Sequence, residues 1–148
     1  MIFIDTNIFL RYFEQKDSSE CDRVEELFHT IISGEVTCFT NTMVISEIIW
    51  VLDKYYGWDR QEICDNIELI LNKPNIKIKE RNILHHAISI YRQYGFDFID
   101  SYNYSYMKAN NSSEIYSYDK HFDKLALLLG NHFTKNSESK EEIYQVFK

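Results

Sequence analysis

The chain has 148 residues, of which 45% are hydrophobic and 16% aromatic, and its formal net charge is −7. This length and apolar content predict one folded domain over residues 1–148 and exclude a disordered chain. The negative charge excludes a protein that binds nucleic acid through a basic surface alone. A chain of this charge that acts on phosphates needs another source of positive charge, and a bound metal ion is one candidate.

The N-terminus carries no basic leader, because Met1 is followed at once by an apolar run, and no long hydrophobic segment occurs. The sequence therefore predicts a cytoplasmic protein without a membrane span. Cys21, Cys38 and Cys64 are odd in number and lack the spacing of metal ligands. We expect them to be reduced thiols that are partly buried.

The first apolar run, residues 2–4, predicts a strand, and residues 7–13 open a helix. An N-cap signal at residues 17–20 precedes apolar residues at helical spacing, and Gly34 ends this second helix. Residues 36–39 then predict the second strand.

A third helix is expected to be capped by Asn41 or Thr42 and to run to about Tyr56, before Gly57 stops it. The helix that follows has its apolar residues on one face and ends at Pro74.

Residues 76–78 predict the third strand, and two more helices are predicted up to Gly95 and over residues 98–109. A strand before Asp119 and a helix over residues 120–129 follow, and the segment after Gly130 is ambiguous. Strands separated by helices are typical of parallel β-α units. The predicted fold class is therefore α/β, a three-layer α/β/α sandwich with a short central parallel sheet.

Two aspartates at opposite ends of the chain each follow a strand-like run. Asp5 follows Ile2-Phe3-Ile4, and Asp119 follows Ile115-Tyr116-Ser117-Tyr118. Ligands of an open parallel sheet bind beyond the carboxyl ends of the strands, where two carboxylates can hold a divalent metal ion. Each aspartate also precedes a helix, so each has an alternative role as an N-cap.

Three further acids could likewise have either a structural or a metal-binding role. Asp97 and Asp100 could be the cap and the third-residue acid of one helix, whose dipole favours negative charge there. Glu47 lies mid-helix in a segment that is apolar nearly all round, which predicts a buried helix. An ionised carboxylate is costly there unless a cation or hydrogen-bond donors compensate it. The alternative is an exposed glutamate on a partly exposed helix.

Clustered carboxylates are the ligands that Mg²⁺ and Mn²⁺ prefer. Such ions orient and deprotonate a water molecule and stabilise charge on a phosphoryl group during in-line displacement. Asn7 and Ser117 are placed to donate hydrogen bonds that fix the ligand rotamers. The histidines show no pattern, although His121 lies close to Asp119 in the sequence.

Four segments, in this order, resemble the motifs of PIN-domain nucleases, specifically the small VapC-like toxins of toxin–antitoxin pairs. They are Asp5-Thr6-Asn7, Ser46-Glu47-Ile48-Ile49-Trp50-Val51-Leu52, Phe98-Ile99-Asp100-Ser101 and Ser117-Tyr118-Asp119-Lys120-His121-Phe122. The resemblance covers essentially the whole chain. Ile99, Ser101 and Ser117 depart from the usual residues beside the third and fourth acids, but no acid is missing.

The resemblance implies a metal-dependent endoribonuclease whose acidic site is formed by Asp5, Glu47, Asp100 and Asp119. The first, third and fourth of these would be the main ligands of Mg²⁺ or Mn²⁺, and Glu47 would ligate directly or through water. Asp97 is a further candidate ligand. The implied partners are an RNA substrate, a cognate antitoxin protein and a second copy of the chain in a homodimer.

Two alternatives stay open at this point. The chain could be an RNA-processing or decay nuclease of the same fold without a toxin role, which the absence of a neighbouring antitoxin gene would favour. It could also be a catalytically silent PIN-like binding module, although the presence of all four acids argues against this. A phosphatase of the haloacid-dehalogenase type is less favoured, because Asn7 stands where that chemistry needs a second aspartate.

Overall fold

The computed structural model describes residues 1–130 and the backbone of residues 134–135. The chain divides into two compact units, residues 1–102 and 103–148, and each is described by itself. The expectation of a single domain over residues 1–148 stays a prediction. The segment after Gly130, which the sequence leaves ambiguous, lies outside the described residues except for a short strand at 134–135.

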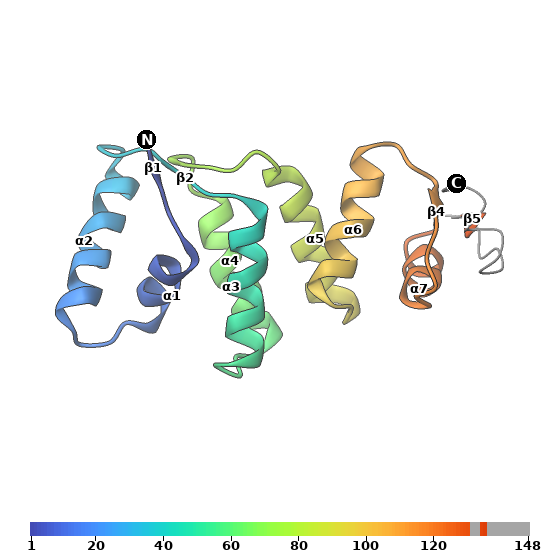
Figure 1. Ribbon diagram of the computed structural model, residues 1–148, viewed down its shortest axis with the longest axis horizontal. Coiled ribbons are helices and arrows are strands. Elements are labelled where there is room, and N and C mark those ends of the chain that lie inside the picture. The colour runs from blue at the N-terminus through green and yellow to red at the C-terminus, as the bar shows by residue number, and fades with distance from the viewer. Residues whose placement is uncertain (131–133, 136–148) are drawn as a thin grey trace, which may run out of the picture. The chain divides into compact units, whose positions relative to one another are not determined.

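Figure 1 shows the helices and strands in chain order. The first unit contains β1 (Ile2–Phe3), α1 (Thr6–Glu14), α2 (Ser19–Ser33), β2 (Cys38–Phe39), α3 (Thr42–Lys54), α4 (Arg60–Leu71), β3 (Ile76–Lys77) and α5 (Arg81–Tyr94). Helix α6 (Phe98–Ala109) begins in the first unit and ends in the second, which continues with β4 (Glu114–Ile115), α7 (His121–Leu128) and β5 (Thr134–Lys135). The predicted elements occur in the predicted order, and α6 has the predicted bounds.

Side-chain caps and left-handed glycines set several of the helix ends. Ser18, Asn41 and Asp59 precede α2, α3 and α4, and each side-chain oxygen accepts a hydrogen bond from the backbone N–H three residues further on. These bonds satisfy donors that helical geometry leaves without a partner. Gly34 and Gly95 end α2 and α5 with φ angles of 86° and 74°, which glycine adopts without steric cost.

The sheet of the first unit is parallel, with the strand order β1-β2-β3. Cys38 in the central strand pairs with Ile2 on one side and with Ile76 on the other. Parallel neighbours require a crossover between strands, and the helices between β1 and β2 and between β2 and β3 supply it.

Hydrogen bonds continue the ladder one residue beyond the strands. The Ile4 N–H donates to the Phe39 carbonyl at 2.9 Å, and the Thr40 N–H donates to the Lys77 carbonyl at 3.1 Å. The Thr40 hydroxyl, which is only 4% exposed, donates to the Ile4 carbonyl at 3.0 Å. The carboxyl ends of all three strands therefore lie side by side.

Strand β4 is shorter than predicted, because residues 116–118 separate it from Asp119. It pairs in parallel with β5 in the second unit, Glu114 opposite Thr134. The Asp119 N–H donates to the Ser117 hydroxyl oxygen at 3.0 Å, a local bond that competes with continuation of a strand ladder. The prediction that Asp119 directly follows a strand is therefore wrong.

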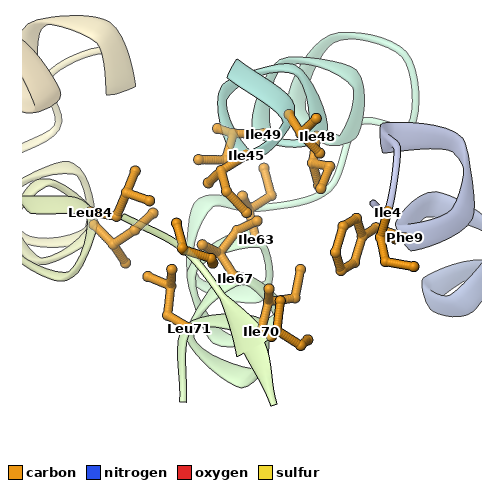
Figure 2. Close-up of a cluster of buried hydrophobic side chains, with 14 of the residues drawn as sticks. Ile4, Phe9, Ile45, Ile48, Ile49, Ile63, Ile67, Ile70, Leu71 and Leu84 are labelled. Carbon is orange, nitrogen blue, oxygen red and sulfur yellow. The ribbon is translucent and has the colours of Figure 1, made fainter. Parts of the chain in front are cut away.

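Helices α3, α4 and α5 enclose most of the hydrophobic core of the first unit. In Figure 2, isoleucine side chains of α3 and α4 point toward one another, with Leu84 of α5 on one side and Ile4 and Phe9 on the other. The side chains with no exposed surface at the centre of this core are Ile45, Ile48, Leu52, Ile63, Ile67, Leu71 and Leu84.

Helix α3 is buried on one stripe only, which corrects the expectation that it is buried nearly all round. Met43 and Trp50 are 76% and 54% exposed, and Glu47 lies between them on the exposed face. Residues three and four positions apart share a helix face, so these three lie together, away from the buried stripe. An apolar side chain is buried only where another element covers it, which the composition of one helix does not reveal.

All three cysteines are free thiols, as predicted. Cys21 is half-buried, whereas Cys38 and Cys64 are buried in the core, and burial raises the pKa of both core thiols. These two side chains therefore behave as small apolar core residues. Among the described residues, no helix combines the length and the apolar composition needed to cross a membrane.

Replacing Ile67 by Ala tests the placement of the core. Ile67 is fully buried on α4, so the change removes apolar contacts and leaves a cavity, and we expect the free energy of unfolding to fall by about 2–5 kcal/mol. Urea unfolding followed by circular dichroism measures this loss. Leu69 on the same helix is 55% exposed, and Leu69→Ala, the matched control, should change the free energy by about 0.5 kcal/mol or less. Equal losses for the two variants would contradict this core.

Candidate functional site

Asp5 stands where β1 leads into α1. Its backbone is extended (φ −89°, ψ 164°), it occupies the N-cap position, and its carbonyl accepts a hydrogen bond from the Ile8 N–H. Its carboxylate makes no capping hydrogen bond, and the side chain is exposed. Ser18, Asn41 and Asp59 do cap their helices through their side chains. Capping therefore explains those three residues and does not explain the carboxylate of Asp5.

Glu47 is exposed on α3, and α1 supplies its hydrogen-bond partner. The Thr6 hydroxyl donates to Glu47 Oε2 at 2.5 Å, and Thr6 itself is only 6% exposed. This bond joins the helix that begins after Asp5 to the helix that carries Glu47. It engages Oε2, and a carboxylate has further lone pairs that can accept other ligands. Sequence reasoning misses Thr6, whose one signal is its position beside Asp5.

Asp97 directly precedes α6 and Asp100 is its third residue, and aromatic packing anchors this helix to α5. The Asp97 carbonyl accepts hydrogen bonds from both the N–H and the hydroxyl of Ser101, each at 3.0 Å. Asp100 lies in the first turn and is half-buried. The ring of Phe98 packs edge-on against Tyr91, with 6.2 Å between ring centroids. The position of Asp100 is therefore set by residues that surround it in the first turn.

The charge of Asp97 acts beyond its own helix. The hydrogen bond to Asp53 raises the pKa of Lys54, and the charge of Asp97 adds a smaller contribution in the same direction. Lys54 is the last residue of α3, about 10 Å along the helix axis from Glu47. The charge of Asp97 thus acts on the C-terminal end of α3.

Asp119 lies in the second unit, in the turn before α7. Its Oδ1 accepts a hydrogen bond from the His121 N–H at 2.9 Å and lies 3.4 Å from His121 Nδ1. One oxygen of this carboxylate is therefore used in cap-like bonding. Ser117 accepts a bond from the Asp119 backbone where the sequence predicted a donor, and Asn7, the other predicted donor, is exposed on α1.

The predicted acids are thus distributed over both units. Asp5, Glu47 and Asp100 belong to the first unit, and Asp119 belongs to the second. Within the first unit, Thr6 links the segment of Asp5 to Glu47. All four acids offer carboxylate oxygens, and at least one oxygen of the Glu47 side chain lies on an exposed face. Carboxylate oxygens are the ligands that a hard divalent cation such as Mg²⁺ or Mn²⁺ prefers.

Comparison with known proteins finds a family model, a relative and a solved structure that match this chain. A sequence model of the PIN domain matches residues 2–128. A VapC ribonuclease of Aquifex aeolicus (strain VF5) is 23% identical over 136 residues, which cover 92% of this chain and 100% of that protein. The crystal structure of Mycobacterium tuberculosis VapC20, a sarcin–ricin loop cleaving toxin, covers 84% of this chain and 95% of its own, at 14% identity and a TM-score of 0.40.

The matched range contains all four predicted acids. Together with the short parallel sheet, the PIN-domain match confirms the predicted fold class, a three-layer α/β/α sandwich.

A pair of alanine substitutions tests whether the Asp5 carboxylate has a capping role. Both Asp5 and Asp59 precede helices, but only Asp59 accepts a capping hydrogen bond. We expect Asp59→Ala to lower the free energy of unfolding by about 1 kcal/mol, the usual cost of a lost cap, and Asp5→Ala to lower it by clearly less. Both variants lose a charge at a helix N-terminus, so their difference in urea unfolding isolates the hydrogen bond. A larger loss for Asp5→Ala would restore the capping interpretation.

Proposed function

This chain belongs to the PIN-domain family, and from that premise we propose that it is a metal-dependent endoribonuclease that cleaves RNA phosphodiester bonds. The observation that carries the proposal is the Asp5 carboxylate, which follows the first strand of the sheet and does not cap the helix after it. An exposed carboxylate at the carboxyl end of a parallel strand stands where ligands of α/β folds bind. The carboxylate of Asp5 is therefore placed to bind a metal ion or a substrate.

We assign Asp5, Asp100 and Asp119 as the main ligands of Mg²⁺ or Mn²⁺, with Glu47 ligating directly or through water. Asp97 is an additional candidate. A bound ion of this kind would place positive charge beside a phosphate and lower the pKa of a water molecule. The ion would also offset the repulsion between RNA and a chain of net charge −7, because carboxylates alone repel phosphates.

The protein's own groups hold these carboxylates in place. Thr6 donates to one oxygen of Glu47 and thereby restricts its rotamer. The His121 N–H does the same for Oδ1 of Asp119, and the Ser117 hydroxyl holds the Asp119 backbone. Each of these bonds reduces the freedom that a ligand would otherwise lose on binding an ion.

The RNA-cleavage mechanism predicts a strict dependence on metal and on two acids. Cleavage of a panel of structured and single-stranded RNAs should occur with Mg²⁺ or Mn²⁺ and stop with EDTA. Asp5→Asn and Asp119→Asn should each lower the cleavage rate by more than about 100-fold. Loss of a residue that only supports a metal ligand typically costs about 10–100-fold. Asp59→Asn is the control, because it removes a carboxylate at another helix start while asparagine keeps the cap. Unchanged cleavage rates for Asp5→Asn and Asp119→Asn would contradict the mechanism.

We further propose that the chain is the toxin of a toxin–antitoxin pair and acts in the cytoplasm, with an antitoxin protein as partner and a homodimer as its assembled form. The relative from Aquifex aeolicus supports this, because that VapC ribonuclease matches along its whole length. The alternative is an RNA-processing or decay nuclease of the same family.

Growth measurements distinguish the toxin from a housekeeping nuclease. Expression of the chain should arrest growth, and co-expression of a small protein encoded beside it should relieve the arrest. Asp5→Asn is the matched control, since an arrest caused by RNA cleavage should disappear with that acid. Normal growth on expression of an active ribonuclease would favour the alternative role.

A further inference from the structure

A polar cluster apart from the four proposed ligands joins the starts of three helices. Glu80 lies between β3 and α5, Thr42 is the first residue of α3, and Tyr102 lies in the second turn of α6. Glu80 Oε2 accepts hydrogen bonds from the hydroxyl of Thr42 and from the hydroxyl of Tyr102, the latter at 2.9 Å. All three side chains are half-buried. One carboxylate oxygen therefore ties together residues 38 and 22 positions away in the sequence.

Glu80 bonds to two other helices and not to its own. It is the residue before α5, and its side chain makes no capping hydrogen bond to that helix, a role for which glutamate is not a preferred residue. Bonds to an ionised carboxylate are stronger than bonds between neutral groups. The carboxylate of Glu80 therefore fixes α3 and α6 and leaves the start of its own helix uncapped.

Both partners of Glu80 lie on helices that carry proposed metal ligands. Thr42 begins the helix that carries Glu47, and Tyr102 follows Asp100 by two residues on α6. Residues two apart in a helix point about 200° apart, so Tyr102 holds one side of α6 while Asp100 is presented on the other. We propose that Glu80 is a positioning residue of the nuclease site, which sets the spacing of Glu47 and Asp100 by holding their two helices.

This inference rests on the proposed function, because spacing matters only if the acids bind an ion together. Metal–oxygen distances in protein sites fall within about 0.2 Å of their preferred values, so a shift of either helix would weaken binding. The half-buried carboxylate of Glu80 contributes little to stability, because its desolvation offsets much of what its two hydrogen bonds contribute. The value of Glu80 therefore lies in geometry.

The experiment measures the Mg²⁺ or Mn²⁺ concentration that gives half-maximal RNA cleavage, together with Mn²⁺ binding by calorimetry. Glu80→Ala should raise both the half-maximal concentration and the Mn²⁺ dissociation constant by about tenfold, the lower end for residues that support metal ligands. Glu80→Gln should recover most of the loss, because its amide oxygen can accept both bonds. Thr42→Val and Tyr102→Phe each remove one bond and should give intermediate values.

Arg92→Met is the matched control. Arg92 on α5 pairs with Asp65 and Glu68 on α4, at 2.9 and 2.8 Å, so the change removes bonds between helices without touching α3 or α6. It should lower the melting temperature and leave the metal dependence as in the unaltered protein.

The outcomes separate the two proposals. If Glu80→Ala lowers the melting temperature but leaves the half-maximal metal concentration unchanged, Glu80 is merely structural and the inference is overturned. Should Glu80→Ala not fold, Thr42→Val and Tyr102→Phe decide, and an unchanged metal dependence in both overturns it equally. If the unaltered chain neither binds Mn²⁺ nor cleaves RNA, the proposed function fails, which the Glu80 variants alone would not reveal.

Discussion

The parallel ladder of β1, β2 and β3 is the constraint on which the first unit depends. Each strand has two residues, and the buried hydroxyl of Thr40 extends the ladder by bonding to the Ile4 carbonyl. Because the strands run in one direction, the chain leaves the sheet at the same edge each time. Asp5, Thr42 and Glu80 therefore begin or precede helices at neighbouring points of that edge. The polar chemistry of the unit follows from this arrangement.

Residues that precede helices fall into two groups in this structure. Ser18, Asn41 and Asp59 use their side chains to cap, whereas Asp5, Glu80 and Lys120 do not. An uncapped helix start forgoes about 1 kcal/mol of stability. Glutamate and lysine are not preferred N-cap residues, so Asp5 is the one member of the second group whose type ordinarily caps, and it follows β1 at the edge where binding is expected. Departures from local rules of this kind are typical of functional sites.

The sequence predicts the order of elements well because the signals are local. The bounds of α6 and the caps of α2 and α3 depend on a few neighbouring residues and agree with the structure. The exposure of Glu47 is not local, because it depends on which elements cover α3. The bonds of Thr6 to Glu47 and of Thr42 to Glu80 join segments 41 and 38 residues apart. Threonine at such positions carries no pattern that a single sequence could reveal.

The short strands also fix the distance between the sheet and the residues that follow each strand. Insertion of one residue into β1 would advance Asp5 by about 3.3 Å along the strand, which exceeds a bond from Mg²⁺ to oxygen. The same insertion would turn Ile4, which is 2% exposed, to the opposite face of the sheet. A strand of two residues is too short to accommodate an inserted residue without shifting the residues that follow it. An inserted residue should therefore be tolerated in a loop better than in a strand, because a loop insertion leaves the distance from sheet edge to carboxylate unchanged.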